Sequence, residues 1–302
     1  MKILITGASG LLGSAVSVCF KDYFDVVSTY TSHKLEINGC KNAYLDITDA
    51  KATLNLIKKI KPKIIVHTAS LVGINACEKE KEITCKVNVE GTENIADAAR
   101  AAKAKIIYIS TDYVFDGKKG MYKENDKPNP INYYGKTKLE GEKFIDLKSD
   151  AVIRTSIYGW NVVKERKSFS TWAIDELRNK KQINVFADQF NSMILVNNLA
   201  EALKIAVDKD INGVLNIASS ERTSKYDFVL KLCSSFGLDK NLVNPIKLKD
   251  MDGSELRPVD TSLDVSNAEK QLRIKLPDYR KQLENMKSMQ IGYLKNFKIK
   301  RV

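Results

Sequence analysis

The chain has 302 residues, of which 43% are hydrophobic and 28% are charged, a balance typical of a folded globular protein and not of a disordered chain. Its 49 Lys and Arg exceed its 37 Asp and Glu, which gives a formal net charge of +12. That excess leaves nucleic acid, a membrane surface or a small polyanionic ligand as candidate partners. The five cysteines are an odd number and lack Cys-x-x-Cys spacing, which argues against a disulfide framework or a zinc site and favours a reducing cytosol.

The sequence shows neither a signal peptide nor a membrane-spanning segment. The first apolar run, residues 3–5, ends at Thr6-Gly7. No later segment reaches about eighteen uninterrupted apolar residues, the length a membrane helix needs. We therefore expect a cytoplasmic protein that does not enter a membrane.

Short β-branched runs alternate with helical patterns through the first half of the chain. The expected strands are 2–6, 26–30, 42–45, 64–67, 105–110 and 151–155, and the expected helices are 11–20, 50–60, 87–102 and 133–147. Such alternation predicts an α/β fold of Rossmann type, a doubly wound parallel sheet that binds ligands at the carboxyl ends of its strands.

The alternation loosens after residue 160. Helices are expected at 170–179, 196–207 and 225–236, strands at 183–186 and 214–217, and the basic tail 295–302 has no clear pattern and is expected to fray. We expect residues 1–160 to form the Rossmann domain, with 183–217 completing its sheet. Residues 161–182 and 218–302 would then form a smaller C-terminal α/β lobe that binds the substrate.

A glycine-rich turn joins the first expected strand to the first expected helix. Gly7, Gly10 and Gly13 have the spacing G-x-x-G-x-x-G, and the turn also contains Ser9, Leu11 and Leu12. These glycines would permit a tight turn, a close approach of the backbone to a pyrophosphate, and close packing of helix on sheet. The helix N-terminus would supply N–H donors to the phosphates, so the turn predicts dinucleotide binding.

The end of the second expected strand indicates which dinucleotide binds. A site that prefers NAD usually places an acid there, but Tyr30, Ser32, His33 and Lys34 precede the first acid, Glu36. Hydroxyls and a lysine suit a 2′-phosphate, so NADPH is favoured and NADH is the alternative. Asp46-Ile47, after the third strand, would either lie near the adenine or cap the next helix.

Tyr134 and Lys138 are spaced by four residues, which places both side chains on one face of a helix. An ammonium beside a phenol lowers the Tyr pKa and prepares it for proton transfer to or from a carbonyl. Thr111 ends the fifth strand, where a ligand site is expected, and its hydroxyl could hold the same oxygen. Tyr133 lacks a lysine four residues later, so Tyr134 is the stronger candidate.

These residues resemble the extended short-chain dehydrogenase/reductases and, among them, the dTDP-4-dehydrorhamnose reductases. The likeness runs to about residue 280 and is most specific at Ser-Thr-Asp-Tyr-Val-Phe-Asp-Gly. The supporting segments are 110–117, 130–142 and 154–159, with Asp188-Gln189, Arg257-Pro258 and Ser262–Asp264 further on.

The resemblance implies roles for the matching residues. Thr111, Tyr134 and Lys138 match the catalytic set. The residues that match cofactor contacts are Thr68, Ala69, Ser70 and Asn88, and the candidates for contact with the sugar nucleotide are Tyr113, Trp160 and Arg257.

Two segments depart from the family pattern. The family typically has a Pro-Thr pair near Asn191-Ser192-Met193, where this chain lacks the proline. Residues 160–167, after Gly159, are charged and unlike the rhamnose enzymes. Both segments lie where substrate choice is expected, so they leave the hydride chemistry intact and the particular sugar open.

The predicted function is NADPH-dependent reduction of the 4-keto group of a nucleotide-linked deoxysugar. Hydride would pass from the nicotinamide C4 to the sugar C4 while Tyr134 protonates the carbonyl oxygen. Lys138 would lower the pKa of Tyr134 and bind the nicotinamide ribose, and Thr111 would orient the reacting oxygen.

Several alternatives remain open at this point. A sugar-nucleotide dehydratase would need Asp-Glu where the chain has Asp112-Tyr113, and an epimerase would hold NAD tightly. A non-catalytic regulatory protein, such as the β subunit of methionine adenosyltransferase, belongs to the same family. Scattered lysines and two distant histidines indicate neither nucleic-acid binding nor a metal site, and a homodimer is compatible with the sequence.

Overall fold

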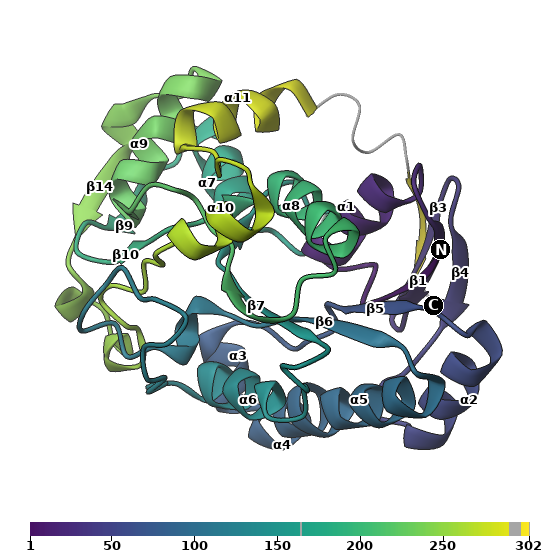
Figure 1. Ribbon diagram of the computed structural model, residues 1–302. Coiled ribbons are helices and arrows are strands. Elements are labelled where there is room, and N and C mark those ends of the chain that lie inside the picture. Colours follow the sequence, from purple (N-terminus) through teal and green to yellow (C-terminus); the bar gives the residue numbers. More distant parts are fainter. Residues whose placement is uncertain (164, 290–296, 302) are drawn as a thin grey trace.

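A parallel seven-stranded sheet in the order β12-β7-β6-β5-β1-β2-β4 forms the centre of the computed structural model, which describes residues 1–163, 165–289 and 297–301 (Figure 1). Its strands are β1 (Lys2–Thr6), β2 (Asp25–Tyr30), β4 (Lys41–Tyr44), β5 (Ile64–His67), β6 (Lys105–Ile109), β7 (Ala151–Arg154) and β12 (Gly213–Asn216). The expected doubly wound α/β fold is confirmed.

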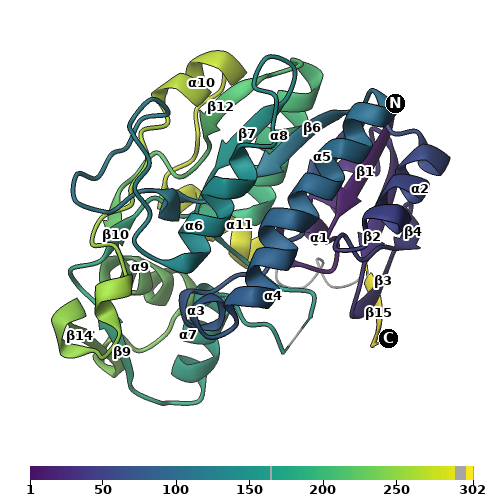
Figure 2. The same cartoon turned by 90° about the horizontal axis from the view of Figure 1, so that it is seen from below.

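Helices cover both faces of this sheet. On one face lie α1 (Leu11–Phe20), α8 (Val196–Asp208) and α10 (Ser266–Leu272), and on the other lie α2 (Ala50–Ile60), α5 (Gly91–Ala102) and α6 (Tyr133–Glu142) (Figures 1 and 2). Successive strand residues point to opposite faces, so Ile3 and Ile5 join the first core and Leu4 joins the second. A strand buried on both faces must be apolar throughout, which explains the continuous run at 3–5.

A second, smaller lobe contains further helices and short strands. Its elements are β8 (Ile157–Tyr158), α7 (Phe169–Arg178), β9 (Ile183–Phe186), β10 (Phe190–Asn191), β11 (Ile194–Leu195), β13 (Thr223–Ser224), α9 (Lys225–Phe236), β14 (Val243–Ile246) and α11 (Tyr279–Met289). Tyr158, Phe228 and Tyr279 form the aromatic centre of its core. The short helices α3 (Ile74–Lys79) and α4 (Lys81–Cys85) precede α5.

The segment 183–217 is divided between the two lobes. β12 pairs with β7 at the edge of the main sheet, as expected for residues completing it. β9 instead pairs in parallel with β14, so this strand belongs to a two-stranded sheet of the smaller lobe.

The C-terminal tail is the clearest difference from the sequence analysis. Residues expected to fray form β15 (Phe297–Arg301), which pairs antiparallel with an unexpected strand, β3 (His33–Ile37). Residues 295, 296 and 302 of the predicted tail lie outside the described residues. The expectation of a patternless tail was wrong because this pairing joins segments more than 250 residues apart, which local periodicity does not reveal.

Two helix boundaries also differ. The helix expected at 87–102 begins with a π-helical turn, Lys86–Glu90, before α5. The helix expected at 133–147 ends at Glu142.

No helix among the described residues is long and apolar enough to cross a membrane.

A buried ion pair fastens α6 to the sheet. Arg154, the last residue of β7, donates from Nε to Glu142 Oε1 at 3.0 Å and from Nη2 to Glu142 Oε2 at 2.7 Å. Both side chains are nearly inaccessible, at 5% and 10% exposure. Ser110 donates to the same carboxylate at 2.5 Å, which satisfies it further.

Removing one partner of this pair should destabilise the fold strongly, because the other charge stays buried without compensation. We expect Glu142→Ala to lower the free energy of unfolding by about 3–5 kcal/mol. Glu140→Ala is the matched control, because Glu140 lies on the same helix in an exposed pair with Lys143, and it should cost less than about 1 kcal/mol. Urea unfolding measures both, and equal losses would contradict the assignment.

Candidate active site

The glycine turn places the backbones of three elements in close contact. Gly7 has a φ of +67°, and a Cβ atom at this position would lie 2.7 Å from the Cα of Ala69. A Cβ on Gly13 would lie 2.4 Å from the Gly7 carbonyl oxygen and 2.7 Å from Thr68 Oγ1. Gly10 caps α1 without a side chain, and the first helical turn carries no acid. This small, anion-compatible cradle fits the pyrophosphate of a dinucleotide.

The ends of β1 and β5 are joined by hydrogen bonds beside this turn. Thr6 Oγ1 accepts from the backbone N–H groups of Thr68 and Ala69, each at 3.2 Å. Thr68 Oγ1 donates to the Thr6 carbonyl at 2.6 Å, and His67 lies 2.7 Å from Thr6 Oγ1. Burial lowers the pKa of His67 to about 3, so this imidazole is neutral.

Of the residues expected near the adenosine, Tyr30 ends β2, and Ser32 and His33 follow with their side chains 2.9 Å apart. Lys34 is paired with Glu36 at 3.3 Å. Asp46 uses Oδ1 to accept from Thr48 N and Oγ1 at 2.9 and 2.8 Å, which closes a local turn. The cap of α2 is Asp49.

Asn88 lies in the π-helical turn, fully buried, and uses both ends of its amide. Its Oδ1 accepts from Ser70 Oγ at 3.0 Å and from Leu71 N at 2.8 Å. Its Nδ2 donates to the Leu71 carbonyl at 3.0 Å and to Thr137 Oγ1 at 3.1 Å. Asn88 therefore links the loop after β5 to α6.

Thr111, Tyr134 and Lys138 converge at the carboxyl end of β6. Burial raises the pKa of Tyr134, and a hydrogen bond with the Thr111 side chain opposes this rise. Thr111 Oγ1 also donates to Asp112 at 3.1 Å, which orients the hydroxyl. The Tyr113 ring lies edge-on to the Tyr134 ring at 6.2 Å.

Lys138 occupies an unexpected position. Its ammonium lies over the Tyr108 ring, 4.1 Å from the centroid, and burial lowers its pKa to about 7. Burial outweighs the opposing Thr111 hydrogen bond in its effect on the pKa of Tyr134, and a lowering of this pKa by Lys138 stays a prediction. Tyr134 holds its proton at neutral pH and can act as an acid.

The candidate substrate residues are separated in space. Arg257 donates to Asn75 at 3.2 Å. Burial raises the pKa of Tyr113, and the charge of Arg257 opposes this rise. Trp160 instead donates from its indole N–H to the Met286 carbonyl at 2.8 Å, within the smaller lobe. The indole is thus committed to a structural contact.

The sequence analysis missed Lys225, the first residue of α9. Its ammonium lies over the Phe169 ring at 4.8 Å and 3.2 Å from Met193 Sδ. Burial lowers its pKa to about 8, with Asp112 opposing and Arg257 adding to the fall. No local pattern distinguishes Lys225 from the many surface lysines, although Met193 belongs to a segment that departs from the family pattern.

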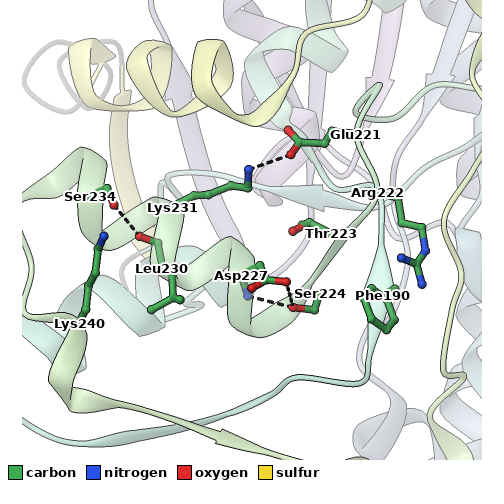
Figure 3. Close-up of a pocket in the computed structure, with 10 residues that line it drawn as sticks. All are labelled: Phe190, Glu221, Arg222, Thr223, Ser224, Asp227, Leu230, Lys231, Ser234 and Lys240. Atoms are coloured by element: carbon green, nitrogen blue, oxygen red, sulfur yellow. Dashed lines mark hydrogen bonds and ion pairs between the residues drawn. The ribbon is translucent and has the colours of Figure 1, made fainter.

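A separate hollow is lined by residues of β10, β13 and α9, among others (Figure 3). Its charges are largely paired: Lys231 with Glu221 at 2.8 Å and Arg222 with Asp260 at 2.7 Å. None of the predicted site residues lines it. Within the described residues, no cluster of His, Cys, Asp or Glu could hold a metal ion.

The depressed pKa of Lys138 predicts a pH dependence of stability. The unfolded chain keeps this proton to about pH 10.5 and the folded chain only to about pH 7, so the free energy of unfolding should rise with pH across this window. We expect Lys138→Met to flatten that rise and to be more stable than the wild type near pH 7. Lys136→Met, an exposed change on the same helix, is the control. Parallel stability curves in urea for all three proteins would contradict the prediction.

Comparison with known proteins shows which family the chain belongs to. The model described as "RmlD substrate binding domain" matches residues 1–290. A probable low-salt glycan biosynthesis reductase, Agl14, from Haloferax volcanii is 31% identical, over 92% of this chain and 94% of the relative. Methionine adenosyltransferase 2 subunit beta from Xenopus tropicalis is 32% identical, over 89% and 82%. A dTDP-4-dehydrorhamnose reductase from Aggregatibacter actinomycetemcomitans is 29% identical, over 95% and 98%.

Solved structures of proteins named as dTDP-4-dehydrorhamnose reductases are also similar to this chain. The hypothetical dTDP-4-dehydrorhamnose reductase from Sulfolobus tokodaii has a TM-score of 0.80 at 36% identity, covering 89% of this chain and 94% of that one. The dTDP-4-dehydrorhamnose reductase from Bacillus anthracis, solved in complex with NADP, has a TM-score of 0.84 at 27% identity, covering 96% and 99%.

Proposed function

The chain belongs to the RmlD substrate binding domain family, and on that premise we propose that it is an NADPH-dependent reductase of the 4-keto group of a nucleotide-linked deoxysugar. The observation that carries this proposal is the meeting of Thr111, Tyr134 and Lys138 at the carboxyl end of the parallel sheet, the end that also bears the glycine turn. The relatives named as dTDP-4-dehydrorhamnose reductases, one of them solved with NADP, support the cofactor and the reaction class.

The glycine turn, the segment Thr68–Ser70 and the end of β2 would hold the cofactor, which supplies a hydride when bound. A Cβ at Gly7 would collide with Ala69 and one at Gly13 with the Gly7 carbonyl oxygen, so these glycines keep the proposed phosphate-binding turn compact. Asn88 fixes the loop that includes Ser70, so this wall of the site is rigid. Lys138, on the inner face of α6, would donate to the nicotinamide ribose.

Tyr134 would donate its proton to the carbonyl oxygen of the sugar. Its burial keeps the phenol protonated, which suits an acid in the direction of ketone reduction. Thr111, oriented by Asp112, would hold the same oxygen. Lys138 is partly neutral near pH 7 in the chain alone, and anionic ligands beside it would favour its charged form.

Two cations lie near the proposed catalytic residues. Lys225 interacts electrostatically with Asp112, and Arg257 interacts electrostatically with Tyr113. Neither cation forms an ion pair in the part of the chain that the structure describes. Two unneutralised cations complement the pyrophosphate of a sugar nucleotide. Lys225 thus joins Tyr113 and Arg257 as a proposed substrate residue, whereas Trp160 would support the lobe.

Removing the phenolic hydroxyl should slow the reaction without weakening cofactor binding. We expect Tyr134→Phe to lower kcat by about 10²–10⁴, measured as NADPH oxidation with a nucleotide-linked 4-keto sugar. Tyr133→Phe is the control, because its hydroxyl lies near Cys85 and away from Thr111. A Tyr134→Phe enzyme as fast as the wild type would refute the assignment.

A panel of nucleotide-linked 4-keto-6-deoxy sugars, with NADPH oxidation as the readout, tests the reaction itself. Turnover identifies the base and the sugar. Interconversion of sugars without net NADPH oxidation would favour an epimerase. No turnover on any sugar, together with tight binding to a partner protein, would favour a regulatory role like that of the methionine adenosyltransferase relative.

A further inference from the structure

The charged segment after Gly159 reaches the cofactor half of the molecule. Val162 and Val163 are 1% and 2% exposed and belong to a small core with Leu35 and Ile37 of β3. Phe297 of β15 packs against the same core. The segment is thus anchored beyond the end of β2, where a dinucleotide places its adenosine ribose.

This anchoring places Arg166 over the residues that follow β2. Its Nη2 donates to Ser32 Oγ at 3.4 Å, and its backbone N–H donates to the Val163 carbonyl at 3.0 Å. Ser32 precedes Arg166 by 134 residues, so the contact depends on the fold and not on a local turn.

Arg166 differs from the nearby lysines in its ion pairing. Lys34, the cation expected at this site, is paired with Glu36 at 3.3 Å. Lys167 is paired with Asp175 of α7 at 3.0 Å. Arg166 has no carboxylate partner among residues 1–163, 165–289 and 297–301. Its guanidinium is therefore the cation at this site that is available to an anion.

We propose that Arg166 determines cofactor specificity by binding the 2′-phosphate of NADPH together with the Ser32 hydroxyl. A guanidinium forms paired hydrogen bonds with phosphate oxygens, and a hydroxyl adds a third donor. The inference rests on the proposed function for its cofactor. It assigns the 2′-phosphate contact to the second half of the chain in place of Lys34.

Binding measurements without sugar substrate test this assignment. Dissociation constants for NADPH, NADH, 2′,5′-ADP and ADP would be measured by titration calorimetry on the full-length wild type, Arg166→Ala and the control Lys167→Ala. We expect Arg166→Ala to weaken NADPH and 2′,5′-ADP by about tenfold or more, the loss of a charge-assisted hydrogen bond. NADH and ADP should bind unchanged, and Lys167→Ala should behave as the wild type.

The outcomes separate this inference from the proposed function. Equal binding of NADPH by the wild type and Arg166→Ala would overturn the role of Arg166 and leave the reductase proposal standing. Equal weakening of NADPH and NADH would also overturn it, because the 2′-phosphate would not be the group contacted. A selective loss for NADPH, in a protein that reduces no keto sugar, would support Arg166 while refuting the reductase. Failure of the wild type to bind either dinucleotide would overturn both.

Discussion

The burial of Lys138 on the inner face of α6 is the constraint on which the site depends. Apolar packing alone does not stabilise an ammonium in this position. The nearby Glu142 carboxylate is already bound to Arg154 and Ser110. The helix is therefore held by close backbone approach: a Cβ on Gly141 would lie 2.4 Å from the Tyr108 hydroxyl. The same ring receives the ammonium, so one aromatic side chain fixes both the height of the helix and the position of its charge.

A continuous buried polar network connects this helix to the glycine turn. Thr137 on α6 accepts from Asn88, the Asn88 carbonyl accepts from Thr92, and Thr92 lies 3.2 Å from His67. His67 in turn contacts Thr6 at the end of β1. The π-helical turn at Asn88 makes this possible, since an inserted residue redirects a side chain that a regular helix would place elsewhere. Because every member is satisfied, the network holds α6 in a fixed position relative to the end of β1.

The sequence predicted what depends on local chemistry. Apolar runs specified the buried strands, the spacing of Gly7, Gly10 and Gly13 specified the turn, and the four-residue spacing placed Tyr134 and Lys138 on one helix face. It did not predict contacts between distant segments. β3 and β15 each lack a partner nearby in sequence, and the alternation of Phe297 and Ile299 with lysines is too short to be recognised alone. Lys225 and Arg166 approach the site from a second lobe whose arrangement no local pattern encodes. The four-residue spacing likewise does not reveal that Lys138 packs on the Tyr108 ring.

The two segments that depart from the family pattern make contacts in different parts of the molecule. Met193 contacts Lys225 on the side of the substrate, whereas Val162 and Val163 pack onto β3 on the side of the adenosine. In the proposed function, substrate choice and cofactor choice would therefore depend on different segments, both from the second half of the chain. The net charge of +12 does not identify these parts of the molecule. Most cations are exposed, and many are paired with carboxylates, whereas a bound phosphate needs a cation that has no such competitor. Arg166, Lys225 and Arg257 are three cations of the described residues without such a competitor, and in the proposed function they are the ones that lie where a ligand phosphate would bind.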